Sequence, residues 1–202
     1  MRAMPRYFRS VLAAALLLVS VGCCSAQLSK EKSGPTLPYL DWGACTFECC
    51  SYGKWEAVRP TVAYKSRDEN GRVSFKSDVG QKVMAVAGVV VTSTFGMTEV
   101  LKPMRMGYTK QSGTPQLSLK NGDILYTLHY AGEASDAFWY KGKVYVDQID
   151  VPDDAMGTAP DTGALKVLSR SEYAWWIKIK DSQGRIGWTR QAENFSGPDR
   201  CS

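Results

Sequence analysis

Three of the six cysteines in this 202-residue chain lie within one stretch of six residues, and thiols are the most reactive side chains that the sequence offers. They are Cys45, Cys49 and Cys50, and a further cysteine, Cys201, is the last residue but one. Such thiols can form disulfides, bind a soft metal such as Zn(II) or Cu(I), or act as a redox site. The spacing lacks the two-residue gap of zinc or thioredoxin-like sites, and the single histidine, His129, lies far away in sequence. The pattern therefore favours disulfides, with a metal or redox centre as the alternative.

The first 26 residues have the layout of a secretory signal peptide. Three arginines form a basic head, an apolar run extends from Val11 to Val21, and small residues end the segment at Ala26. The run is too short for a transmembrane segment, and no later stretch is both long and apolar enough. We therefore expect an exported protein, periplasmic or secreted. In the alternative, the Ser20–Cys23 stretch resembles a lipoprotein box, and a lipid on Cys23 would anchor the chain at the cell envelope.

Export to an oxidising compartment makes two disulfides the expected state of the four remaining cysteines. A bond between the adjacent Cys49 and Cys50 has poor geometry, which leaves two connectivities. One pairs Cys45 with Cys49 and Cys50 with Cys201, and the other pairs Cys45 with Cys50 and Cys49 with Cys201. In both, the carboxyl terminus is tied back to the amino-terminal segment.

Charge and motifs exclude several functional classes. The net charge of +5 falls to +2 when the three arginines of the signal are removed, and no run of basic residues forms a phosphate-binding stripe. We therefore expect no nucleic acid partner. The sequence also lacks a zinc-binding H-E-x-x-H, a phosphate-binding G-x-x-x-x-G-K and a nucleophile elbow G-x-S-x-G, and His129 has no evident catalytic partner. A protein that is not an enzyme and carries no cofactor or metal is expected.

From about Trp55 to Phe195, short runs of β-branched and aromatic residues alternate with turn residues, which predicts an all-β protein without a helix in the mature chain. The expected hairpin turns are Asn70-Gly71, Asn121-Gly122, Lys141-Gly142 and Gln183-Gly184. The expected strands are Thr61–Lys65, Arg72–Phe75, Lys82–Thr92, Asp123–Tyr130, Ala137–Tyr140, Lys143–Gln148, Ala174–Lys180 and Gly184–Thr189. Short strands in this number suit one elaborated barrel or two small ones.

Alternation within two of these strands predicts which faces are buried. In the first, the predicted core face is Ile124, Tyr126, Leu128 and Tyr130, with Thr127 and His129 on the more polar face. In the second, the predicted core face is Trp175, Ile177 and Ile179, with Trp176, Lys178 and Lys180 outward. Trp176 is therefore expected to be exposed.

The hairpin formed by Trp176–Ile179, a polar turn and Ile186–Thr189 resembles the closing hairpin of a bacterial SH3-like (SH3b) domain, whose strands read W-x-K-V and G-W-V. The stretch Leu119–Tyr126 is similar to the family's L-x-x-G-D-x-V strand, and a weaker echo lies at Ser77–Val86. The resemblance implies one or two small SH3-like barrels with a disulfide-stapled amino-terminal segment. The expected divisions are a signal peptide (1–26), a cysteine-containing segment (27–54), a possible SH3-like domain (55–112), an SH3-like barrel (113–195) and a carboxyl-terminal tail (196–202).

The family resemblance implies a binding module, in which aromatic residues near the loop ends contact the ligand. The residues that it implies are Trp176, Trp139, Tyr140, Tyr145 and Trp188. Because small barrels also need aromatic residues for their cores, packing is the alternative role for each of them. The implied partner is peptidoglycan, through its glycan or its peptide, and the alternative is an envelope protein, for instance an exported hydrolase that the module inhibits.

Overall fold

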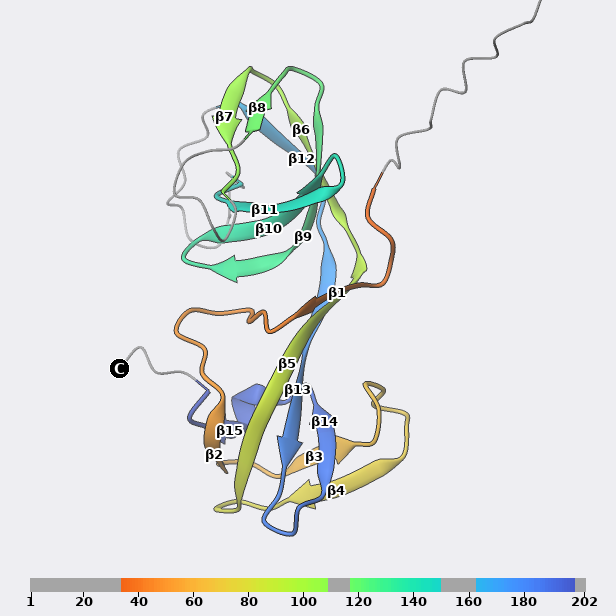
Figure 1. Ribbon diagram of the computed structural model, residues 1–202, viewed down its shortest axis with the longest axis vertical. Helices are drawn as coiled ribbons and strands as arrows, with labels where there is room; N and C mark the ends of the chain where they lie inside the picture. Colours follow the sequence, from red (N-terminus) through yellow and green to blue (C-terminus); the bar gives the residue numbers. More distant parts are fainter. Residues whose placement is uncertain (1–33, 109–116, 150–162, 199–202) are drawn as a thin grey trace, which may run out of the picture. The chain divides into compact units, whose positions relative to one another are not determined.

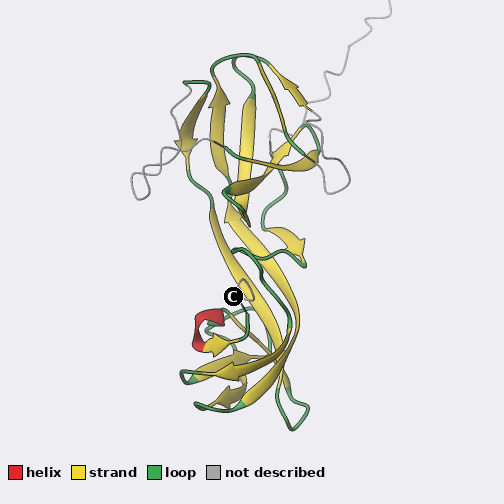
Figure 2. Cartoon of the chain, turned by 90° about the vertical axis from the view of Figure 1, so that its left-hand side faces the viewer, coloured by secondary structure: helices red, strands yellow, loops and turns green. Residues whose placement is uncertain are grey.

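The computed structural model describes residues 34–108, 117–149 and 163–198, and this part of the chain is built from antiparallel strands. The predicted all-β class is confirmed, because the one helical element among these residues is a short 3₁₀ turn, η1 (Ala192–Asn194) (Figure 2). The predicted signal peptide, the alternative lipidation site at Cys23 and the predicted disulfide partner Cys201 lie outside the described residues.

The first sheet is curled and follows the order β15-β2-β5-β13-β14-β3-β4, and β1 also pairs with β5 (Figure 1). Its centre is the pair of long strands β5 and β13, which run antiparallel from Met84 opposite Lys180 to Thr94 opposite Glu172. Its strands are β1 (Tyr39–Trp42), β2 (Gly53–Ala57), β3 (Thr61–Tyr64), β4 (Val73–Ser77), β5 (Lys82–Thr94), β13 (Glu172–Lys180), β14 (Ile186–Thr189) and β15 (Phe195–Ser196).

Alternate residues of these strands form the core of the first sheet, as the period of a half-buried strand requires. Ile177 and Ile179 are completely buried and Trp175 is nearly so, which confirms the predicted inward face of β13. They pack in one cluster with Trp55 of β2 and Phe195 of β15. Burial of these large apolar side chains is the main stabilising contribution to this part of the protein.

The second sheet follows the order β11-β10-β9-β6-β12, and β7 and β8 form a separate pair. Its core contains Val100, Leu125 and Phe138, none of which reaches solvent, together with Tyr140 and Tyr145. The strands are β6 (Gly96–Val100), β7 (Met104–Met106), β8 (Leu117–Leu119), β9 (Ile124–Gly132), β10 (Ser135–Tyr140), β11 (Lys143–Asp147) and β12 (Leu165–Ser169).

All the predicted strands are present, within a few residues of their expected ends, but the prediction of a hairpin at Asn121-Gly122 was wrong. The chain does turn there, yet β8 before the turn pairs with β7 and β9 after it pairs with β6 and β10. The turn instead contacts β6, since the Gly122 N–H donates to the Val100 carbonyl at 2.8 Å and the Val100 N–H donates to Asp123 at 2.9 Å. An Asn-Gly pair specifies the turn, and the partners of the flanking strands are chosen by the rest of the fold.

The predicted faces of β9 were only partly right. Leu128 is buried as expected, but Leu125 and His129 are buried as well, whereas Tyr126 and Tyr130 are only half-buried. The register between β9 and β10 shifts at this point, and Leu128 has no direct partner on β10. Such a bulge changes which side chains point inward on either side of it, so strict alternation fails.

The two sheets are interleaved along the sequence. The hairpin β13–β14, which carries the family resemblance, pairs with β5 and β3 from the amino-terminal half of the chain. Conversely, β6 pairs with β9 and β12 of the second sheet. A division of the chain between residues 112 and 113 therefore does not separate the two sheets.

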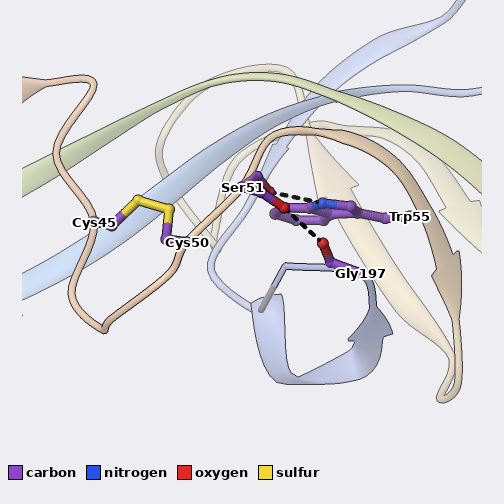
Figure 3. Close-up of a disulfide and its surroundings, with 5 residues drawn as sticks. All are labelled: Cys45, Cys50, Ser51, Trp55 and Gly197. Carbon is purple, nitrogen blue, oxygen red and sulfur yellow. Dashed lines mark hydrogen bonds between the residues drawn. A yellow bond between two sulfur atoms is a disulfide. The ribbon is translucent and has the colours of Figure 1, made fainter. Parts of the chain in front are cut away.

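Cys45 and Cys50 form a disulfide, with 6.2 Å between their Cα atoms, and this excludes the connectivity with a Cys45–Cys49 bond (Figure 3). Cys49 is disulfide-bonded as well. In this state the sulfur atoms are not thiolates, which is the form in which cysteine binds a metal. Among the described residues there is also no group of three or more histidine, cysteine or carboxylate side chains that could hold a metal ion.

The amino-terminal segment is held against the carboxyl-terminal one next to this disulfide. The Ser51 N–H donates to the Pro198 carbonyl at 2.7 Å, and the Ser51 hydroxyl donates to the Gly197 carbonyl at 3.1 Å. The indole N–H of Trp55 donates to the Ser51 carbonyl at 3.0 Å (Figure 3). β15 continues the attachment by pairing with β2. The expected return of the chain's carboxyl end to its amino-terminal segment is thus present as hydrogen bonds through Pro198.

Candidate ligand-binding face

Three tryptophans share the face of the first sheet opposite the core formed by Trp175 and Ile177. Trp42 of β1 is paired with Val89 of β5, and Val89 is paired with Trp176 of β13. Trp188 of β14 is paired with Lys178, two residues after Trp176 on the same strand. Directly paired residues and residues two apart project to the same side of a sheet, so all of them face one way.

The exposed indoles meet around an arginine. The ring centroids of Trp42 and Trp188 are 6.1 Å apart in an edge-on arrangement. The guanidinium carbon of Arg67 lies 5.2 Å from the Trp42 ring centroid and 5.6 Å from that of Trp188. The Lys178 ammonium lies 5.8 Å from the Trp188 centroid. We call Trp42, Trp176, Trp188, Arg67 and Lys178 the tryptophan face.

Arg67 belongs to the loop between β3 and β4, which local hydrogen bonds keep in shape. The Asp68 carboxylate accepts from the Asn70 N–H at 2.9 Å, as expected for an aspartate in a turn. Glu69 forms an ion pair with Arg190 at 3.1 Å, which ties the loop to the end of β14. The pairing of β3 with β4 and these two contacts place Arg67 over the indoles.

Arg67 and Lys178 give the tryptophan face positive charge, and neither forms an ion pair within the part of the chain that the structure describes. Arg67 makes no hydrogen bond or ion pair with the described residues, and its Nη1 atom is buried without a partner. The neighbouring acids are engaged elsewhere, since Asp68 accepts from Asn70 and Glu69 pairs with Arg190. Cation–π attraction to the two indoles holds the guanidinium in place. An unpaired buried donor is costly, so this arrangement favours an acceptor brought by a ligand.

Two of the five sequence-predicted contact residues, Trp176 and Trp188, lie in the tryptophan face. Trp188 is half-buried, but the expected exposure of Trp176 was wrong, because its side chain is only 6% exposed. Arg190 lies over the Trp176 ring, with its guanidinium carbon 5.9 Å from the ring centroid. Trp176 therefore supports this surface from below, while Trp42, at 56% exposed, is the most accessible of the three indoles.

The other three predicted residues lie in the second sheet. Tyr140 and Tyr145 are each 8% exposed and belong to its core, so packing is the role that the structure gives them. Trp139 is half-buried, and its ring packs edge-on against Tyr126 at 5.7 Å. None of the three belongs to the tryptophan face.

Sequence reasoning missed Trp42 and Arg67. Trp42 is the last residue of the run Tyr39-Leu-Asp-Trp42. This run is a short strand signal, and it lies close to the cysteine cluster. Arg67 carries no local signal, because its role depends on two indoles that belong to strands remote in sequence.

His129 is buried next to a cavity of about 570 Å³. Its Nε2 atom lies 3.0 Å from a carboxylate oxygen of Asp41, and its Nδ1 atom lies 2.8 Å from the Tyr130 carbonyl. The described residues that line the cavity include Lys143, Tyr39 and Tyr108, together with Cys45, which is in the disulfide. The contact between His129 and Asp41 connects β9 to β1.

The carboxyl group of Asp136, close to His129, gives the protein a pH-dependent stability. Burial raises the pKa of Asp136 to about 6, although His129 and Arg170 oppose the rise. A carboxyl group with a higher pKa in the folded state than in the unfolded chain favours folding when protonated, so its contribution is lost as the pH rises from about 4 to 6. We expect Asp136→Asn to gain up to roughly 3 kcal/mol of stability relative to wild type at pH 7, and little at pH 4.

Urea unfolding of the wild type and Asp136→Asn between pH 3.5 and 7.5 measures this effect. The difference in the free energy of unfolding between the two proteins should grow through the window from pH 4 to 6 and then level off. A difference that stays constant across this range would show that Asp136 titrates as an ordinary exposed aspartate.

Comparisons of the chain with protein families, with curated proteins and with solved structures found no match. The SH3-like resemblance thus stays a prediction that depends on the hairpin and strand motifs of the sequence. In the part of the chain that the structure describes, no helix has the length and apolar character needed to cross a membrane.

Proposed function

We propose that the protein is an exported, non-catalytic binding module that holds cell-wall glycan on the tryptophan face. The observation that carries this proposal is the pair of neighbouring indoles, Trp42 and Trp188, which are accessible on one side of a rigid sheet. The electron-rich face of an indole attracts the polarised C–H bonds of a sugar ring, and adjacent rings can contact successive sugars. A sheet holds these rings in place before the ligand arrives, which lowers the entropy cost of binding.

The amino-terminal segment and the disulfide agree with the role of an exported wall-binding module. The amino-terminal segment predicts export, and the Cys45–Cys50 disulfide suits an oxidising compartment. The module would meet peptidoglycan there, in the periplasm or outside the cell. A lipid on Cys23, if present, would place the same surface at the membrane.

Removing one indole should weaken wall binding strongly. We expect Trp188→Ala to lower the affinity for purified peptidoglycan by roughly 10-fold to 100-fold, the usual range for loss of an aromatic stacking partner. Co-sedimentation of the mature protein with peptidoglycan at increasing polymer concentration measures this affinity. Trp139→Ala is the matched control, because it removes a half-buried tryptophan from the second sheet and should leave sedimentation unchanged. The urea midpoint of both variants verifies that they are folded.

A protein partner is the second candidate, because tryptophan and arginine are also the residues that dominate protein–protein hot spots. In that case the wild type would not sediment with peptidoglycan. It would instead form a complex with one envelope protein, for instance an exported hydrolase, and Trp188→Ala would disrupt that complex. Absence of sedimentation would therefore contradict glycan binding.

A further inference from the structure

The positive charges around Trp188 indicate the charge of the ligand, which the indoles alone do not specify. Arg67 and Lys178 both lie over this one ring, at 5.6 and 5.8 Å from its centroid. Two cations that converge on one site repel each other, and neither forms an ion pair with a described residue. By contrast, Arg190 beside Trp176 is neutralised by Glu69. The positive charge is thus concentrated where the accessible indoles meet.

We infer that the tryptophan face recognises a sugar that carries a carboxylate. The sugar ring would lie on Trp42 and Trp188, and its carboxylate would pair with Arg67, with Lys178 adding a second positive charge. This inference rests on the proposed function and narrows it to glycan with free muramic acid carboxylates, because the carboxyl group of a muramic acid that bears a stem peptide is part of an amide bond.

The guanidinium group supplies the specificity. Its N–H groups form a flat fork that matches the two oxygens of a carboxylate, and such charge-assisted pairs are stronger than neutral hydrogen bonds. Nη1 of Arg67 is buried without a partner, and the other guanidinium nitrogens make no hydrogen bond with the described residues either. Trp42, whose ring centroid lies 5.2 Å from the guanidinium carbon, is 56% exposed, so the edge of the site is accessible to a ligand.

The experiment compares two sugars that differ mainly in the acidic group. N-acetylmuramic acid and N-acetylglucosamine are titrated into the mature protein, and binding is followed by calorimetry and by tryptophan fluorescence. We expect the acid to bind at least 10-fold more tightly at low salt, and the difference to shrink as salt is added because the ion pair is screened. Arg67→Gln should abolish the preference for N-acetylmuramic acid over N-acetylglucosamine. Arg67→Lys should restore only part of it, because lysine lacks the fork.

The controls separate this inference from the proposed function. Arg105→Gln removes an exposed arginine from β7 and should bind both sugars as the wild type does. Equal affinity of the wild type for the two sugars, with sedimentation on peptidoglycan retained, would overturn the inference and leave the proposed function intact. N-acetylglucosamine 6-phosphate binding as tightly as the acid would also overturn it. If Arg67→Gln does not fold, Lys178→Gln replaces it and should reduce the preference for the acid.

Discussion

Replacing Trp55 with alanine is expected to lower the free energy of unfolding by about 3 to 5 kcal/mol, the range for a buried tryptophan in a well-packed core. Only 2% of this residue is exposed, and its ring contacts Trp175 and Phe195 with centroid distances of 6.3 and 5.7 Å. Its indole N–H also donates to the Ser51 carbonyl, in the segment that holds the carboxyl-terminal residues. The substitution therefore removes core packing and a hydrogen bond that supports the contact between Ser51 and the carboxyl-terminal segment at Gly197.

Urea unfolding followed by far-ultraviolet circular dichroism measures the loss. Because a small domain is stable by only about 5 to 15 kcal/mol, the variant should be largely unfolded at modest denaturant concentrations. Trp139→Ala is the matched control, and we expect it to cost about 1 kcal/mol, because its ring is half-buried against Tyr126. Equal losses for the two variants would contradict the placement of Trp55 at the centre of the core.

Replacing His129 with leucine is expected to lower the free energy of unfolding by about 2 to 4 kcal/mol. Leucine keeps much of the side-chain volume but leaves the Asp41 carboxylate without its partner at 3.0 Å. Loss of one member of a fully buried pair costs about 3 to 5 kcal/mol, and the 20% exposure of the Asp41 side chain reduces that figure. The Tyr130 carbonyl also loses its contact with the ring.

A double-mutant cycle with Asp41→Asn separates the interaction from the loss of packing. If the pair is coupled as the geometry indicates, the double variant should be destabilised by less than the sum of the two single variants, with a difference of about 1 to 2 kcal/mol. Additive losses would show that His129 contributes only by filling space. Far-ultraviolet circular dichroism and urea unfolding at pH 7 suffice for all four proteins.

About half of the strands could be predicted from the sequence, because a run of β-branched and aromatic residues between two turns indicates a strand without information from the rest of the chain. The hairpin of β13 and β14 is specified by a polar turn at Gln183-Gly184 between two runs of alternating residues, and both its strands and its inward residues, Ile177 and Ile179, are confirmed. Seven strands were missed, each of at most five residues, which is too short for a clear alternation: β1, β2, β6, β7, β8, β12 and β15. In β9, a bulge at Leu128 broke the period on which the prediction depended.

Sequence reasoning identified two of the five residues of the tryptophan face. Trp188 and Trp176 were identified through the family resemblance, because they lie at fixed positions of one hairpin. Trp42 and Arg67 were not, because they reach the same face from β1 and from the loop between β3 and β4. The burial of Trp176 follows from Arg190, which lies over its ring, and alternation along one strand cannot show what covers its outward face.

The β class, the turns and the preference for disulfides could be predicted from the sequence, since each depends on residues that are close together in the chain. Only the tertiary structure decided which strands pair, that Cys45 bonds with Cys50, and that His129 meets Asp41 across 88 residues. It also decided that Arg67 lies against two indoles and forms no ion pair with the described residues. The physical reason is that these features depend on side chains brought together by long-range pairing of β5 with β13, and local propensity carries no information about that pairing.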